Sequence, residues 1–161
     1  MPKIAAETTT AEETLAGQSP LATSLSSEKI REFWDERIKA HSVFSARTTS
    51  RRYLDAVRKR LAQVASRQIS PEEAEKKLRE TLETLGYRPE TGFREDGGGA
   101  IPAARPGSIR DLSSSHRIQL ILDTNVKQAR SLGQIAASED PFSLMVDPAW
   151  KLTRTGARKK P

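Results

Sequence analysis

Apolar residues recur at helical spacing in four stretches of this chain. The first stretch begins after Ser26 or Ser27, and either hydroxyl can cap a helix. Its apolar positions share one stripe of the expected helix, and they are Ile30, Phe33, Trp34 and Ile38. Phe33 and Trp34 are the largest of these side chains, so we expect them to anchor a core or an interface.

The second and third stretches predict an antiparallel helical hairpin. The second runs from Thr48 or Ser50 to Arg67, and its apolar seam is Tyr53, Val57, Leu61 and Val64. The third begins at Ser70-Pro71, where a capping serine precedes a proline at the first helical position, and Glu73 completes a capping box. Its apolar face is Ala74, Leu78, Leu82 and Leu85, and Gly86 is placed to end it. Only two or three residues separate these helices, which predicts that they pack side by side.

The fourth and longest amphipathic stretch covers residues 113–137. Its main apolar positions lie on one side and are Ile118, Leu122, Val126, Ala129 and Leu132. Leu120 widens this stripe, so we expect much of the helix to be buried. Ala129 and Gly133 are small and four residues apart, which permits close approach of another helix. Asp123, Thr124 and Asn125 are expected to hydrogen-bond to a loop or a neighbouring helix.

Polar and glycine-rich segments divide these elements. Residues 1–26 have no apolar periodicity and predict an arm that is disordered or bound to a partner. Residues 27–86 form the helical region with its hairpin, and residues 87–112 form a Gly/Pro-rich loop that we expect to be mobile and to order on a partner. Residues 113–161 form the long helix and a basic tail, in which a short strand is predicted near Trp150. The fold class is therefore mainly α: an extended helical protein with long loops.

Composition limits the core and the chemistry. Apolar residues make up 35% of the chain and aromatic residues 5%, while charged residues reach 30%. This predicts either an extended protein whose apolar faces are completed by other subunits, or a small helical core with disordered ends. Cysteine is absent and there are two histidines, so neither thiolate nor histidine-rich metal sites are expected. We find no catalytic motif, signal peptide or apolar run that could span a membrane. We expect a soluble protein made in a cytoplasm, without enzymatic activity or a cofactor.

Positive charge is concentrated in one helix. Residues 47–67 carry seven basic residues and one acid, against a formal charge of +6 for the whole chain. A solvated helix face would explain this, and the acidic third helix partly neutralises it. The alternative hypothesis is a basic nucleic-acid-binding accessory protein. The residues that would contact nucleic acid or an acidic surface are Arg51, Arg52, Arg58, Arg60, Arg158, Lys159 and Lys160.

The long helix also carries a family resemblance. Arg117, Ile121, Thr124-Asn125, Ala129 and Gly133 resemble the Arg-x-x-x-Ile-x-x-Thr-Asn-x-x-x-Ala-x-x-x-Gly pattern of phage Mu F-like head morphogenesis proteins, also called minor head or minor capsid proteins. The Asp140-Pro141 pair and residues 148–152 resemble the segment after that helix in such proteins. Family members usually continue through a strand-rich segment with Trp, His and Cys positions, which this sequence lacks. A short or split member is therefore expected.

The resemblance implies a structural component of a tailed-phage virion, assembled in the bacterial host cytoplasm. Its partners would be the portal or major capsid protein, in a multicopy ring or vertex assembly, with a possible contact to packaged DNA. No membrane contact is expected. The predicted partner-interface residues are Phe33, Trp34, Tyr53, Ile118, Leu122, Ala129, Gly133 and Trp150.

Overall fold

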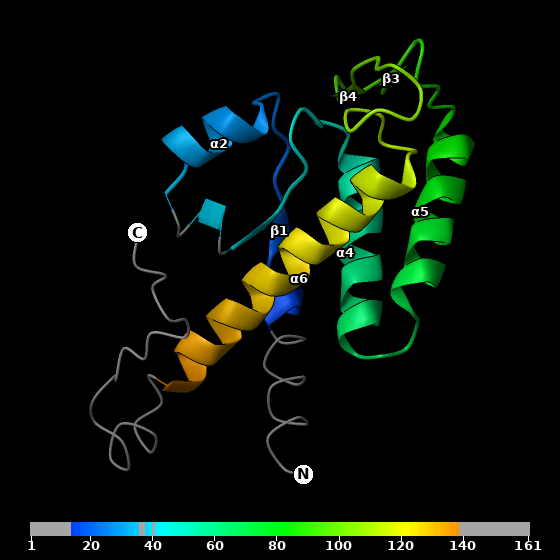
Figure 1. The fold of residues 1–161 in the computed structure, drawn as a ribbon. Coiled ribbons are helices and arrows are strands. Elements are labelled where there is room, and N and C mark those ends of the chain that lie inside the picture. Colours follow the sequence, from blue (N-terminus) through cyan, green and yellow to red (C-terminus); the bar gives the residue numbers. More distant parts are fainter. Residues whose placement is uncertain (1–13, 36–37, 40, 139–161) are drawn as a thin grey trace, which may run out of the picture.

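A helical hairpin crossed by one long helix organises the fold (Figure 1). The computed structural model describes residues 14–35, 38–39 and 41–138, with side chains as far as Leu132. The protein is mainly α, as predicted. Its elements are β1 (Ser19–Pro20), α2 (Ser27–Phe33), β2 (Ser42–Val43), α4 (Arg51–Ala65), α5 (Pro71–Leu85), β3 (Phe93–Arg94), β4 (Ala100–Ile101) and α6 (Ser115–Ser138).

Local sequence signals set the ends of the hairpin helices. The Ser50 hydroxyl accepts a hydrogen bond from the amide of Tyr53 at the start of α4. The Ser70 hydroxyl accepts one from the amide of Glu73, and Pro71 occupies the first turn of α5. Gly86 ends α5 in the left-handed conformation, with φ of 85°. The predicted hairpin is confirmed, with α4 and α5 packed together.

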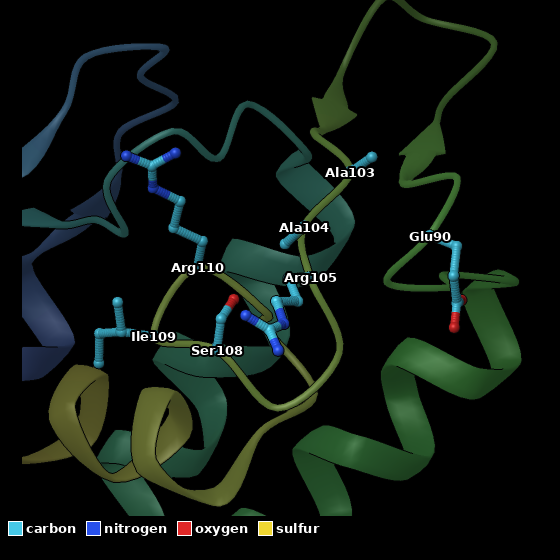
Figure 2. Close-up of a pocket in the computed structure, with 7 residues that line it drawn as sticks. All are labelled: Glu90, Ala103, Ala104, Arg105, Ser108, Ile109 and Arg110. Atoms are coloured by element: carbon cyan, nitrogen blue, oxygen red, sulfur yellow. The ribbon is translucent and has the colours of Figure 1, made fainter.

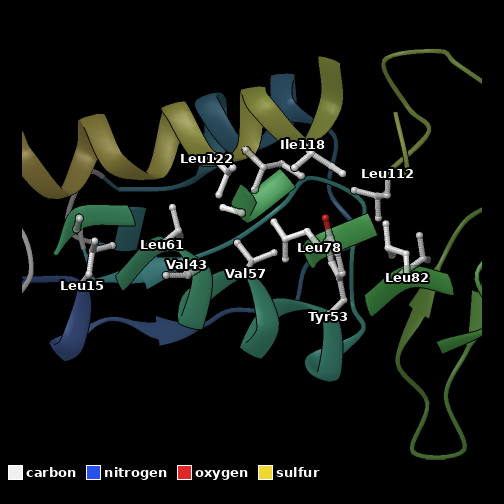
Figure 3. Close-up of a cluster of buried hydrophobic side chains, with 14 of the residues drawn as sticks. Leu15, Val43, Tyr53, Val57, Leu61, Leu78, Leu82, Leu112, Ile118 and Leu122 are labelled. Atoms are coloured by element: carbon white, nitrogen blue, oxygen red, sulfur yellow. The ribbon is translucent and has the colours of Figure 1, made fainter. Parts of the chain in front are cut away.

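One hydrophobic core lies between the hairpin and α6 (Figure 3). The apolar faces of α4 and α5 meet there, and α6 closes the core with a face of its own. Leu15 and Val43 extend the core beside α4. Because these side chains lose nearly all contact with water, their burial is the main driving force for this arrangement. The buried positions on the three helices include Tyr53, Val57, Leu61, Ala74, Leu78, Leu82, Ile118, Ile121, Leu122 and Ala129.

The segment before α2 packs on the rest of the chain, where the sequence predicted a disordered or partner-bound arm. β1 pairs in parallel with β2, and the amide of Leu21 donates to the carbonyl of Val43 at 2.9 Å. Thr23 forms an antiparallel bridge with Thr48, and Leu15 is buried in the core. Backbone hydrogen bonds and one buried leucine therefore order residues 14–26 without any apolar periodicity. Residues 1–13 lie outside the described residues.

Helix α2 is shorter than its predicted apolar stripe. It begins at the Ser26 cap and ends at Phe33, because the backbone of Trp34 is extended, with φ of −93° and ψ of 125°. Of the stripe, only Ile30 is buried, while Phe33 is 66% exposed and Ile38 is 43% exposed. The turn brings the Trp34 ring edge-on to Phe44, with ring centroids 5.0 Å apart. Trp34 is thus a packing residue, whereas Phe33 faces solvent.

The segment between α5 and α6 is held by the chain itself, whereas we expected it to order on a partner. β3 and β4 pair antiparallel, with Phe93 opposite Ile101. The amide of Thr49 donates to the carbonyl of Ala100 at 2.9 Å, and the amide of Ala100 donates to the Thr49 hydroxyl at 2.8 Å. Glu95 accepts hydrogen bonds from the Ser50 hydroxyl and the amide of Arg52. This segment therefore caps the start of α4.

Several predicted features of the C-terminal part lie outside the described residues. They are the strand near Trp150 and the basic residues Arg158, Lys159 and Lys160. The side-chain environment of Gly133 also lies outside them. Among the described residues, no helix is long and apolar enough to cross a membrane.

Candidate functional site

Two polar residues of α6, Arg117 and Asn125, contact the segment that precedes α4. Nη2 of Arg117 donates to the Ser45 hydroxyl at 3.2 Å and to the carbonyl of Ala46 at 3.1 Å. Two turns later, Nδ2 of Asn125 donates to the carbonyl of Phe44 at 3.4 Å and to the carbonyl of Ile121 at 2.8 Å. These two side chains fix residues 44–46 along α6. The prediction that Asp123, Thr124 and Asn125 hydrogen-bond to a loop or a neighbouring helix is confirmed for Asn125 alone, since Asp123 and Thr124 are exposed.

The guanidinium of Arg117 is an uncompensated charge in this junction. Its burial lowers its pKa, and the nearby Arg47 guanidinium lowers it further. Both of its acceptors are neutral, and it forms no ion pair within the described ranges. Nε of Arg117 and the Tyr53 hydroxyl are buried and have no hydrogen-bond partner among the described atoms. The junction is therefore a costly polar arrangement in an otherwise apolar core.

A second polar link joins α5 to the start of α6. Arg79 donates to the carbonyl of Ser113 at 3.2 Å, to the Ser115 hydroxyl at 2.8 Å and to Oε1 of Glu75 at 2.7 Å. Gln119 donates to the other oxygen of Glu75 at 3.0 Å. The contact with Ser115, together with these donors, holds the pKa of Glu75 below its ordinary value. Sequence periodicity could not reveal this link, because its members are ordinary surface residues of two separate helices.

A buried carboxylate organises the turn before α6. Asp111 is 3% exposed, and its oxygens accept hydrogen bonds from the amide of Gly107 at 2.8 Å and the amide of Ser113 at 2.9 Å. The Ser113 hydroxyl donates to it at 2.7 Å and the Tyr87 hydroxyl at 3.4 Å. Burial alone would raise the pKa of Asp111, but these hydrogen bonds hold it below the ordinary value. The carboxylate acts as a structural acceptor for backbone amides.

The predicted basic face of α4 is narrower in the structure. Arg51 and Arg52 are exposed, and neither side chain forms an ion pair within the described part of the chain. Arg58 instead donates to the carbonyl of Ala16 at 2.9 Å, and Arg60 donates to Oε1 of Gln63 at 2.7 Å. Arg58 and Arg60 therefore use part of their hydrogen-bonding capacity within the chain, which leaves them less available to a ligand than Arg51.

Four of the eight predicted partner-interface residues are buried inside the chain. Tyr53, Ile118, Leu122 and Ala129 lie in the core, so the prediction that they contact a partner is wrong for these four. The apolar stripes of α4 and α6 are covered by other helices of the same chain. Phe33 remains available at the surface.

Besides Ile38, two further exposed apolar residues were not predicted as partner contacts. Leu120 is 44% exposed, because it lies on the outer side of α6 and does not widen the buried stripe as expected. Ile109, in the turn before α6, is 45% exposed. Leu120 lies two residues from both Ile118 and Leu122, so helical spacing places it on the opposite side of the helix and could have identified it as exposed. Ile109 lies in a turn and carries no such signal.

An open hollow of about 510 Å³ lies beside the turn before α6. Its lining residues are Glu90, Ala103, Ala104, Arg105, Ser108, Ile109 and Arg110. Figure 2 shows Arg110 extending away from Arg105 and Ser108, with Glu90 on the opposite side. The charged groups therefore do not converge on a common point. Within the described residues, no group of three His, Cys, Asp or Glu side chains is placed to hold a metal ion.

Comparison with known proteins identifies no relative of this chain. No protein-family model, curated protein or solved structure matches this chain.

Proposed function

We propose that this chain is a structural component of a tailed-phage virion, a minor head or head-morphogenesis protein associated with the capsid, portal or head–tail vertex. The observation that carries the proposal is the residue pattern of α6. Arg117, Asn125 and Ala129 belong to the stretch that resembles the pattern of phage Mu F-like proteins. In this fold Arg117 and Asn125 hold residues 44–46, and Ala129 is fully buried. The pattern residues thus have connected structural roles.

Exposed apolar side chains supply contacts for neighbouring virion proteins. Phe33 offers a large apolar group at the end of α2, and Leu120 offers another on the outer side of α6. Large aromatic side chains such as Phe33 are enriched at protein interfaces and anchor them when a partner covers them. Leu120 would add apolar area to such a contact. A portal or capsid surface would cover them in the assembled particle.

Proteomics of purified particles tests the proposal. We expect the chain in intact virions, in several copies, and expect it to copurify with the portal or major capsid protein. The Phe33→Ser variant should enter particles less well, whereas Glu28→Ser, on the same exposed helix, should enter them normally. Particles that lack the chain, from cells that express it, would overturn the proposal.

The second candidate is a nucleic-acid-binding accessory protein. The observation in its favour is that Arg51 and Arg52 are adjacent, exposed and without ion pairs in the described region. Binding to double-stranded DNA should then weaken as salt rises, because each neutralised phosphate releases counterions. Replacing Arg51 and Arg52 with Gln should reduce both affinity and salt dependence more than replacing Arg58, which is bonded to Ala16. Binding that is equal in all variants would reject this candidate.

A further inference from the structure

The outer surfaces of the hairpin carry two matched rows of charge. On α4, the row is Arg51, Asp55 and Lys59, and all three side chains are exposed. On α5, the row is Glu72, Lys76 and Glu80, which are likewise exposed. Residues four apart lie next to each other on one side of a helix. Each row therefore presents three alternating charges along its helix.

The row residues lack partners among the described residues, whereas four other charged residues of the hairpin pair with each other on α5. Glu73 pairs with Lys77 at 3.1 Å, and Glu75 pairs with Arg79 at 2.7 Å. None of the six row residues forms an ion pair or a side-chain hydrogen bond within the part of the chain that the structure describes. Helix α5 thus has one set of charged side chains that pair with each other along the helix and another set that faces solvent without partners in the described region.

The two rows are complementary in sign and equal in length. The α4 row reads positive, negative, positive, and the α5 row reads negative, positive, negative. Each spans nine residues, and the eight steps between its ends cover about 12 Å along a helix. Because each row reads the same in both directions, the match holds for parallel and antiparallel helices. The rows cannot meet within one molecule, since α4 and α5 already pack through their opposite, apolar sides.

We propose that two copies of this chain associate by placing the Arg51–Asp55–Lys59 row of one copy against the Glu72–Lys76–Glu80 row of the other. These rows would be the surface through which the copies of the proposed virion protein assemble. The proposal depends on the proposed function only for where the association occurs, and the association itself can be tested without it. Asp55 favours a second copy over nucleic acid, because a carboxylate in the middle of the row repels phosphates. Exposed ion pairs are individually weak and are screened by salt, so the association is weak and salt-sensitive.

Charge-swap complementation of the full chain tests this proposal. In the first variant, Arg51→Glu and Lys59→Glu make the α4 row wholly negative. In the second, Glu72→Lys and Glu80→Lys make the α5 row wholly positive. Each variant alone should self-associate at least about tenfold more weakly than the wild type at low salt, because like charges then face each other. A mixture of the two variants should associate again, since the reversed rows complement one another.

Sedimentation equilibrium at low and high salt provides the measurement, and thermal melting checks that each variant is folded. The matched control replaces Lys127 and Arg130, exposed on α6, with Glu, which changes the net charge as much as the first variant does. The control should associate like the wild type. A wild-type monomer at every salt concentration, association that requires added DNA, or an equal loss in the α6 control would overturn the proposal. The association assay uses purified protein and does not depend on the virion role. If the mixed variants associate again but the chain is absent from particles, the virion role is rejected and the association through the charge rows stands.

Discussion

The guanidinium of Arg117 donates a hydrogen bond to the backbone carbonyl of Ala46 at 3.1 Å, across 71 positions of the sequence. This bond, with that from Arg117 to Ser45, ties the beginning of α6 to the segment that leads into α4. The contact stabilises the fold only in part, because the charge is mostly buried without a carboxylate. The hydrogen bonds of Arg117 should therefore stabilise the fold, whereas its buried charge should destabilise it, and substitutions can separate the two effects.

We predict that Arg117→Ala lowers the free energy of unfolding by about 1–3 kcal/mol, because it leaves the Ala46 carbonyl without its donor and removes packing. Arg117→Met should cost less, since it keeps the apolar stem and removes the buried charge. Arg130→Ala, on the exposed side of α6, should change stability by no more than about 0.5 kcal/mol. Urea unfolding measures all three. A loss for Arg117→Ala as small as for Arg130→Ala would show that the junction contributes little.

Asp111 makes stability depend on pH. Burial opposes its charge, but hydrogen bonds from Ser113 and Gly107 hold its pKa in the folded state below the ordinary value of 3.8. A lowered folded pKa gives stability that is complete above the unfolded pKa and is lost as pH falls through the folded value. We therefore predict that acidification below about pH 4 destabilises the protein partly through Asp111.

The variant Asp111→Asn isolates this effect. At neutral pH it should lose about 1–3 kcal/mol, because an amide cannot replace a carboxylate that accepts four hydrogen bonds. Its stability should also fall less steeply between about pH 5 and pH 3 than that of the wild type. Asp123→Asn, at an exposed position of α6, should behave like the wild type. Equal acid sensitivity in Asp111→Asn and the wild type would contradict the assignment.

Gly92 is one of the positions in the loop between α5 and α6 that require glycine. Gly92 has φ of 71°, and a Cβ placed there would lie 2.8 Å from the amide nitrogen of Ala103 and 2.9 Å from the carbonyl carbon of Pro102. These are backbone atoms, so relief requires movement of the chain. We predict that Gly92→Ala costs about 2 kcal/mol or more.

Gly97 provides the matched control for Gly92. It lies at the tip of the same loop, its φ is not positive, and a Cβ there would meet nothing within 4 Å. Gly97→Ala should therefore leave stability within about 0.5 kcal/mol of the wild type. Thermal or urea unfolding compares the two variants. If both alanines were tolerated equally, the close approach at Gly92 would not constrain the loop.

Helices were predictable where local residues determine them. Ser70-Pro71 and Gly86 mark the ends of α5 with side-chain and backbone chemistry that acts within a few residues. The buried stripe of α6 was predictable for the same reason, since spacing alone places Ile118 and Leu122 on one side. The end of α2 was not predictable, because Trp34 leaves the helix to pack on a distant ring, Phe44.

The remaining features depend on contacts between distant segments. β1 is a two-residue strand that pairs with residues 42–43, and so short an element has no periodicity to detect. Asp111 looks like a loop acid in the sequence, and only folding brings Tyr87 and Gly107 to its oxygens. The charge rows of α4 and α5 could be counted from the sequence, but their exposure and lack of partners needed the structure.

Two buried tyrosines with different surroundings allow a paired prediction. Tyr53 lies fully inside the core, and its hydroxyl has no hydrogen-bond partner among the described residues. The Tyr87 hydroxyl accepts a hydrogen bond from the amide of Leu112 at 3.3 Å and donates one to Asp111 at 3.4 Å. Burial raises the pKa of both hydroxyls, that of Tyr87 to about 12. The two groups are thus alike in burial and opposite in hydrogen bonding.

We predict that Tyr53→Phe leaves stability unchanged or raises it by up to about 1 kcal/mol, because it removes a buried polar group that lacks a partner. Tyr87→Phe should lower stability by about 1–2 kcal/mol, because the Leu112 amide and Asp111 each lose a partner. Both substitutions remove one oxygen and keep the ring, so the difference between them isolates the hydrogen bonds. Urea unfolding at neutral pH measures it. A larger loss for Tyr53→Phe than for Tyr87→Phe would show that the Tyr53 hydroxyl has a stabilising partner, such as an internal water beside Arg117.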